Sequence, residues 1–261
     1  MDTLSIFGPL IAMLLVPIAL LYWWQWHTHR KDEREHAEAL AAFADEVGGK
    51  VVGRDEARAW SADLLSPLRH QTEGFFNKLG TRRRARFDTA IDFRRDGWPV
   101  RVSEASIRKS VPTAGTTTIY EYRIEVAVDS VLPPMRISQL VHADFRGRPL
   151  PPTPSGYATE PPSGAPQWLP ARLPAEVEQD FAAYTTDPVA VARAFTPQVV
   201  EWMVGRTDEP SFLSTMPFLL HFEGGLVFAT IGKRIDTETL LPRVDAIIGL
   251  ISRLGDRPAL R

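Results

Sequence analysis

Cysteine is absent from the 261 residues, and lysine is scarce, because arginine supplies most of the 30 basic side chains. A chain without cysteine forms no disulfide, which fits a reducing compartment but does not require one. Basic and acidic residues nearly balance, at 30 against 32, and the net charge is −2. This balance excludes a protein that binds nucleic acid through bulk positive charge, so no nucleic-acid partner is expected. No catalytic or cofactor motif occurs either, so we assign no catalytic residue, cofactor or metal ligand.

Charge is also missing from the stretch between Thr3 and Gln25. As a helix, its apolar centre at residues 4–24 would cover about 31 Å, close to the hydrocarbon thickness of a bilayer. A buried helix of a soluble core would normally be shorter or carry a polar stripe. A cleaved signal peptide would need a positive start and a small-residue cleavage site. The stretch therefore predicts a transmembrane anchor over residues 1–26, with the lipid bilayer as its first partner.

Aromatic residues gather at one end of the predicted span, where amphipathic rings favour the lipid headgroup layer. These interfacial anchor residues are Tyr22, Trp23, Trp24 and Trp26. Positive charge follows at Arg30, Lys31 and Arg34, and positively charged flanks stay on the cytoplasmic side. We therefore expect a single-pass protein of the cell membrane, with its N-terminus outside and its C-terminal domain in the cytoplasm.

A juxtamembrane helix is expected over residues 27–49, ending at Gly48 and Gly49. His27, His29 and His36 lie in it, but their spacing fits solvated side chains better than a metal site. A second helix is expected at residues 54–65.

Arginine is concentrated in the loop that follows this second helix. The run consists of Arg82, Arg83, Arg84 and Arg86. Near a membrane anchor it is a candidate for contact with anionic lipid headgroups, at about 1 kcal/mol per charge. A solvated loop is the alternative interpretation. No aromatic platform for stacked bases is interleaved with the arginines.

The apolar period changes to two after this loop, which predicts antiparallel strands. Residues 87–102 form a hairpin that turns at Asp96 and Gly97, and residues 120–128 form a long strand. A shorter strand is expected near residues 135–139. The alternation predicts a sheet with one wet face that carries Glu121, Arg123 and Glu125. Glu104 falls on the apolar side, which indicates either a bulge that shifts the strand's phase or an inward acid; a bulge or the end of the strand is the favoured interpretation.

Proline punctuates the rest of the chain. Residues 147–175 hold many of the 22 prolines and are expected to form a loop or linker. A polyproline ligand at residues 149–154 is a weaker interpretation. Two helices that open at Pro188 and Pro197, a hairpin at residues 218–230 and a final amphipathic helix follow. In the hairpin, His221 alternates with phenylalanines and Glu223 lies two residues on, but neither is paired with a nucleophile.

Several packing motifs resemble those of bacterial membrane-anchored proteins that carry a domain of unknown function. They are the strand pair at residues 87–104, IYEYRIEV at residues 119–126, FTPQVVEW at residues 195–202 and the hairpin at residues 218–228. The resemblance covers most of the chain from Phe87 onward except the proline-rich stretch. It implies the architecture but no activity and no site residues.

The predicted fold class is α+β, in which a transmembrane helix precedes a soluble domain with an antiparallel sheet and flanking helices. Its regions are the anchor (1–26), the juxtamembrane helix (27–49), an α+β region (50–146), the proline-rich loop (147–175) and a helix-helix-hairpin-helix region (176–261) that packs on residues 50–146. The predicted function is a cytoplasmic binding or scaffolding module with an unidentified protein partner. The alternatives are a membrane-tethered enzyme, with a site around Glu104, His221 or Glu223, and a structural subunit of a membrane complex.

Overall fold

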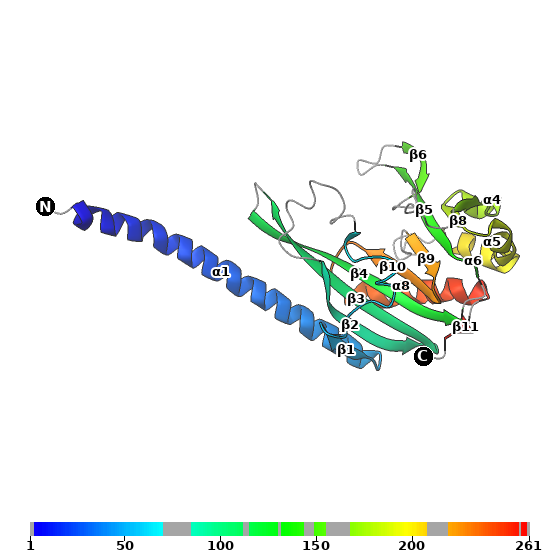
Figure 1. The fold of residues 1–261 in the computed structure, drawn as a ribbon, viewed down its shortest axis with the longest axis horizontal. Helices are drawn as coiled ribbons and strands as arrows, with labels where there is room; N and C mark the ends of the chain where they lie inside the picture. Colours follow the sequence, from blue (N-terminus) through cyan, green and yellow to red (C-terminus); the bar gives the residue numbers. More distant parts are fainter. Residues whose placement is uncertain are drawn as a thin grey trace. The chain divides into compact units, whose positions relative to one another are not determined.

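The computed structural model describes residues 3–69, 85–111, 115–129, 132–143, 149–154, 168–207, 219–255 and 257–259. The chain divides into two compact units, Met1–Phe43 and Ala44–Arg261, and Figure 1 draws both. The second unit combines a large antiparallel sheet with flanking helices. The α+β class predicted from the sequence is thereby confirmed.

Helix α1, Thr3–Glu46, is continuous over 44 residues. It ends where Gly48 adopts a φ of +64° and the Gly49 amide donates to the Ala44 carbonyl at 2.7 Å. This left-handed cap is the stop that the two glycines predict. In the described part of the chain, no helix is long and apolar enough to cross a membrane. Most side chains of the span expected at residues 4–24 lie outside the described residues, so that span stays a prediction.

The described strands form one sheet in the order β1-β2-β3-β4-β10-β9-β5-β8-β7, with β11 paired to β4 and β6 paired to β5. Their bounds are β1 Lys50–Gly53, β2 Arg86–Arg95, β3 Trp98–Val111, β4 Gly115–Asp129, β5 Met135–Ala143, β6 Pro149–Pro154, β7 Leu169–Ala171, β8 Phe181–Thr185, β9 Leu219–Glu223, β10 Leu226–Ile231 and β11 Arg257–Pro258. Because β10 lies between β4 and β9, the regions predicted at 50–146 and 176–261 share this sheet.

Both predicted hairpins are present, and the backbone conformation of their turn residues explains why they form. Asp96 and Gly97 have φ of +50° and +83° between β2 and β3, while Gly224 and Gly225 have φ of +64° and +71° between β9 and β10. Two successive positive φ values give the tight turn that matches the twist of paired strands, and Asp-Gly and Gly-Gly adopt it readily.

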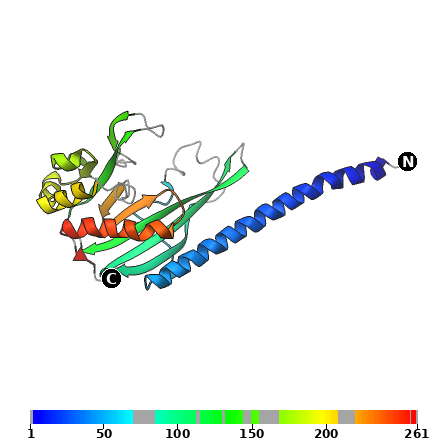
Figure 2. The same ribbon diagram turned by 180° about the vertical axis from the view of Figure 1, so that it is seen from behind.

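One face of the sheet packs on helix α8, Thr237–Arg253 (Figure 2). The helix buries its apolar stripe, which consists of Leu240, Val244, Ala246, Ile247, Ile248, Leu250 and Ile251. Arg243 of this helix donates to the Tyr122 hydroxyl of β4 at 2.8 Å. Tyr122, Ile124 and Val126 therefore form the apolar face that their alternation predicts.

The described part of this unit also contains three shorter helices: α4 at Ala175–Glu178, α5 at Pro188–Ala194 and α6 at Pro197–Thr207. The Asp187 carboxylate accepts from the amides of Val189 and Ala190 at 3.1 and 3.0 Å, so it caps α5 as an aspartate before proline should. Helix α6 contacts α8, where a Cβ on Gly249 would come within 2.8 Å of the Trp202 ring. The close approach of these two helices needs glycine there.

The proline-rich stretch departs from the expected loop at two places. Residues 149–154 form β6 beside β5, and residues 169–171 form β7 beside β8. Among the described strands each of these has one partner, so each has one side without a described ladder. Proline is tolerated on such edges because its missing N–H is not needed there.

Candidate functional site

The face of the sheet opposite α8 is the part that differs most from expectation. Glu121, Arg123 and Glu125 lie on it in alternate positions of β4, but Arg123 and Glu125 have no solvent exposure and Glu121 has 7%. The prediction of a wet face is wrong here. The segment at residues 54–68 covers these three side chains and bonds to them.

This covering segment was expected to be a helix over residues 54–65, and it consists of turns instead. The amides of Trp60 and Ser61 donate to the two carboxylate oxygens of Glu125 at 2.8 and 2.7 Å. The amide of Leu68 donates to Glu121 at 3.1 Å. Buried amides need acceptors, and here strand carboxylates take the place of helix carbonyls. The segment can therefore stay irregular although it is partly buried.

Arg123 joins the two acids to the same segment. Its Nη1 donates to the Ser61 hydroxyl and the Leu65 carbonyl, both at 2.9 Å, and its Nη2 lies 3.4 Å from Glu121. Burial lowers the pKa of Arg123, which the two neighbouring carboxylates oppose, and burial raises the pKa of Glu121, which Arg123 and the Leu68 amide oppose. We call Glu121, Arg123 and Glu125 the buried charge row.

Arg101 of β3 fixes the first part of the covering segment. It binds the Asp92 carboxylate through two N–H groups at 2.6 Å each. The hydrogen bond to Asp92 raises the pKa of Arg101 above the usual arginine value. Another N–H group donates to the carbonyl of Arg58 at 2.8 Å. The guanidinium also lies over the Trp60 ring, 5.3 Å from its centre. The backbone of Arg58 is therefore held in place from the sheet.

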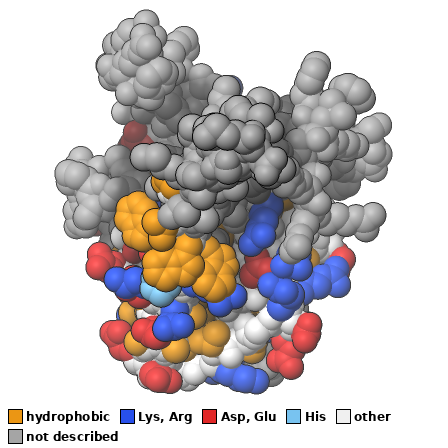
Figure 3. Space-filling model, turned by 90° about the vertical axis from the view of Figure 1, so that its left-hand side faces the viewer, with side chains coloured by type: hydrophobic (Ala, Val, Ile, Leu, Met, Phe, Trp, Pro, Cys, Tyr) orange, Lys and Arg blue, Asp and Glu red, His pale blue; other side chains and the backbone are white. Residues whose placement is uncertain are grey.

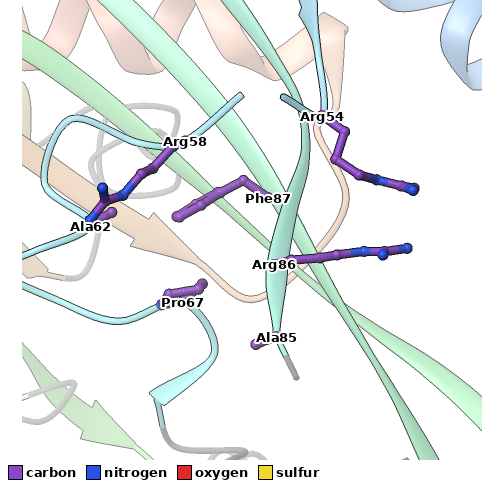
Figure 4. A pocket seen from close by; sticks show the side chains of 7 residues that line it. All are labelled: Arg54, Arg58, Ala62, Pro67, Ala85, Arg86 and Phe87. Carbon is purple, nitrogen blue, oxygen red and sulfur yellow. The ribbon is translucent and has the colours of Figure 1, made fainter. Parts of the chain in front are cut away.

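A cleft opens where this segment meets the start of β2. Its volume is about 350 Å³, and Figure 4 shows the side chains that line it. They are Arg54, Arg58, Ala62, Pro67, Ala85, Arg86 and Phe87. The Phe87 ring points toward Arg58 and Ala62, and the side chains of Arg54 and Arg86 extend next to each other on the other side of the strand (Figure 4).

A bulge in β2 produces this arrangement. Phe87 pairs with Ala105, but Thr89 pairs with Glu104, so Asp88 is the extra residue. The extra residue moves Phe87 to the face that carries the covering segment, whereas regular alternation would put it beside Thr89 and Ile91. The Asp88 carboxylate accepts from Arg54 at 3.3 Å and from Arg86 at 3.1 Å, and the Ser106 hydroxyl donates to its other oxygen.

Of the candidate lipid-contact residues, Arg86 lies in the cleft, whereas Arg82, Arg83 and Arg84 lie outside the described residues. The structure joins Arg86 to Arg54 and Arg58. Sequence reasoning missed these two arginines, and Phe87 and Asp88 with them. No spacing could have indicated them, because a bulge has no signature in the alternation of this strand.

The predicted interfacial residues lie on α1. Trp23, Trp24 and Trp26 are 59%, 64% and 52% exposed, while the side chain of Tyr22 lies outside the described residues. His27 stacks on Trp23 with 5.5 Å between ring centres, and Arg30 lies 3.9 Å from the centre of the Trp26 ring. Figure 3 shows exposed hydrophobic side chains gathered beside a histidine on one face.

The residues suggested for an enzyme site do not converge. Glu104 lies opposite Tyr122 on the α8 face, and the pairing of β3 with β4 continues through it without a bulge. It is 3% exposed and accepts from the Ile235 amide at 2.8 Å. The bulge expected in its own strand is therefore wrong, because the bulge lies in β2. Glu104 is the inward acid, and it holds the entrance to α8.

His221 and Glu223 lie on the opposite face, since His221 pairs with Phe228 and Phe228 with Glu125. The His221 ring stacks on Phe228 with 4.7 Å between centres. Burial, with Arg136 and Arg123 nearby, lowers the pKa of His221 to about 3. A neutral histidine packed on phenylalanine has a structural role, and the sheet separates it from Glu104.

Comparison with known proteins identifies no relative: no family model matches the chain, and neither does any curated protein or solved structure.

The hydrogen bonds of the buried charge row predict a pattern of amide exchange. In Glu125→Ala we expect faster hydrogen exchange at Trp60 and Ser61, whose amides lose their acceptor, with a smaller change at Leu68. In Glu121→Ala the order should reverse. Each lost bond to a charged acceptor corresponds to about 1.5–3 kcal/mol, so the affected amides should exchange at least tenfold faster. Equal acceleration of all three amides in both variants would show that the two acids do not act locally.

His221 predicts a dependence of stability on pH. Its pKa in the folded chain is about 3, below the ordinary value of 6.5, so the unfolded chain binds the extra proton between these values. The contribution of the neutral ring to the free energy of unfolding is fully present above pH 6.5, and it is lost as the pH falls toward 3. We expect the free-energy difference between the parent chain and His221→Gln to fall by up to about 1.4 kcal/mol per pH unit in this window. Urea unfolding of the full chain measures it, and His27→Gln is the exposed control. A difference that stays constant from pH 7 to pH 4 would contradict a buried neutral histidine.

Proposed function

We propose that this chain is a single-pass membrane protein whose α+β unit is a binding or scaffolding module on the cytoplasmic side. The observation that carries the proposal is the exposed tryptophan group of α1, Trp23, Trp24 and Trp26, which lies at the C-terminal end of the uncharged residues 3–25 on one continuous helix. Exposed tryptophan is costly in water and favourable at the headgroup layer. At about 1.5 Å per residue, a helix of this length is long enough to cross a bilayer and extend well beyond it.

A binding role is favoured over catalysis because Glu104 and His221, two of the residues suggested for an enzyme site, serve the fold. Glu104 and His221 are separated by the sheet, and each has a packing or capping partner. By contrast, the arginines of the cleft are partly exposed at the surface. A structural subunit of a membrane complex stays an alternative, and recovery of the lone chain from gentle detergent would count against it.

The anchor predicts a defined behaviour in membrane fractionation. The full chain should stay in the membrane pellet after alkaline carbonate extraction. Leu14→Arg with Ile18→Arg should move it to the supernatant, because each charge costs about 2.5–3.5 kcal/mol at the centre of a span. Leu14→Ile with Ile18→Val is the matched control and should stay in the pellet. Extraction of the parent chain by carbonate would rule out the anchor.

The proposed orientation in the membrane predicts on which side a reporter fused after Arg261 is active. The reporter should be active in the cytoplasm, because the cluster of Arg30, Lys31 and Arg34 is retained on that side. Replacing these three residues by glutamine, and adding two lysines after Met1, should reverse the orientation. Activity of the parent fusion on the outer side would contradict the assignment.

A further inference from the structure

Four arginines lie on the α8 face of the sheet, where β2, β3 and β4 extend past the start of α8. They are Arg54, Arg86, Arg108 and Arg234, and we call them the arginine patch. We propose that the arginine patch binds the headgroups of anionic phospholipids. This inference deepens the proposed function, because it names a partner of the α+β unit. It rests on the proposed anchor only for the bilayer that holds the chain near the lipid.

Helix α8 covers only part of the face on which the patch lies. Its 17 residues extend about 25 Å, whereas the 15 residues of β4 extend about 50 Å. Figure 2 shows β3 and β4 continuing past the helix. Burial follows this boundary, since Tyr122 of β4 is fully buried while Tyr120 and Thr118 are partly exposed. The sheet beyond Tyr122 is therefore open to a partner on this side.

The strand register brings three of the arginines together. Arg86 pairs with Ser106 and Ser106 pairs with Tyr120, so these side chains share one row across β2, β3 and β4. Arg108 lies two residues after Ser106 and therefore points to the same side, about 7 Å further along β3. The guanidinium of Arg234 lies 4.6 Å from the centre of the Tyr120 ring.

Arg54 joins this row through Asp88. The Asp88 carboxylate accepts from Arg54 at 3.3 Å and from Arg86 at 3.1 Å, and the Ser106 hydroxyl donates to its other oxygen. Figure 4 shows Arg54 and Arg86 extending together away from the cleft, on the side of β2 opposite Phe87. The arginine patch is therefore a surface separate from the cleft.

Positive charge exceeds negative charge in the patch. Two carboxylates lie beside the four arginines: Asp88, which two of them share, and Glu104, which is 3% exposed. Lys233 and Asp236 form an ion pair with each other at 2.9 Å, so they cancel. Arg108 is exposed and has no ion pair in the described part of the chain. Two positive charges are thus in excess.

The exposed guanidinium groups suit phospholipid headgroups. Arg54 and Arg86 keep 58% and 45% of their exposure, and each gives one of its five N–H donors to Asp88 in these bonds. The remaining donors match the oxygens of phosphate and carboxylate groups. The cytoplasmic leaflet, which the proposed orientation makes the near one, is rich in anionic lipids that attract basic side chains.

The width of the patch favours a lipid surface over one small anion. Strands β2 and β4 lie on either side of β3, about 10 Å apart. One phosphate group cannot reach both ends of the patch, whereas neighbouring headgroups of a bilayer can. Nucleic acid is disfavoured because Arg234 lies over the Tyr120 ring, in the place that a stacked base would take.

The proposed anchor increases the effect of this modest charge excess. Arg54 follows Glu46, the last residue of α1, by eight positions, so a short stretch of chain joins the patch to the helix. A tethered site meets its partner at a high effective concentration. Two excess charges bind lipid weakly from solution, but the same contact becomes populated beside a bilayer.

The test uses the full chain with one fluorophore, because the chain lacks cysteine and a single introduced cysteine is labelled uniquely. Thr118→Cys places the label beside Arg108, with which Thr118 pairs. Val189→Cys, at a position of α5 that is 61% exposed, is the control. Each labelled chain is reconstituted in phosphatidylcholine nanodiscs that contain a trace of lipid with a quencher on its headgroup, with or without added phosphatidylserine.

We expect phosphatidylserine to increase the quenching of the Thr118→Cys label about twofold, and high salt to reverse the increase, because ions screen exposed charges. The quenching of the Val189→Cys label should not depend on the lipid. Equal quenching of the Thr118→Cys label in both kinds of nanodisc would overturn the proposal, and it is the result expected if an acidic protein is the partner of the patch.

Charge variants separate lipid binding from folding. Arg86→Gln with Arg108→Gln should abolish the increase that phosphatidylserine causes. Arg172→Gln with Arg193→Gln removes the same charge at exposed positions away from the patch and should keep the increase. Asp88→Asn should enlarge it, because a competing carboxylate is removed, whereas a damaged fold would not. An increase that persists in Arg86→Gln with Arg108→Gln would contradict the proposal.

A vesicle experiment keeps the patch testable without the anchor. If carbonate extraction shows that the chain is not anchored, the full chain is mixed with vesicles of phosphatidylcholine, with or without phosphatidylserine, and floated on a density gradient. Flotation with phosphatidylserine alone, lost in Arg86→Gln with Arg108→Gln, would support the patch although the anchor has failed. Flotation with neither kind of vesicle would overturn it.

Discussion

The architecture of the α+β unit depends on the buried charge row of Glu121, Arg123 and Glu125. Three charged side chains on one face of a central strand cost several kcal/mol each to desolvate, unless their partners are in place. The covering segment supplies those partners through its amides, a carbonyl and a hydroxyl. In return the acids satisfy amides that would otherwise be buried without an acceptor. The charged face of β4 and the covering segment therefore stabilise each other.

This mutual dependence connects the interior of the unit to its surface. Because Arg101 and Glu125 fix the covering segment, the side of the cleft that carries Arg58 and Ala62 has a defined position. The bulge at Asp88 sets the other side by turning Phe87 inward and leaving Arg86 at the rim. A site of this kind is built from ordinary packing and hydrogen bonding, and it needs no catalytic constellation.

Sequence patterns predicted those elements whose signals are local. The turns at Asp96-Gly97 and Gly224-Gly225, the cap at Asp187 and the stripe of α8 all depend on residues within a few positions of one another. The segment at residues 54–65 also has a helical pattern, but its hydrogen-bond partners lie about 60 residues away on β4. Such long-range bonds override local propensity, so this helix was predicted wrongly. The cleft could not be predicted for the same reason.

By itself the amino-acid sequence determined the α+β class, the long N-terminal helix with its tryptophan group, and the strand pairs, since each follows from composition, periodicity or turn chemistry along a short stretch. Only the tertiary structure decided that the charged face of β4 is buried, that Glu104 points inward, and that Arg86 belongs with Arg54 and Arg58. The physical reason is that alternation along a strand shows which residues share a face but not what covers that face. Whether charged side chains meet water or a backbone amide depends on a segment that is distant in sequence.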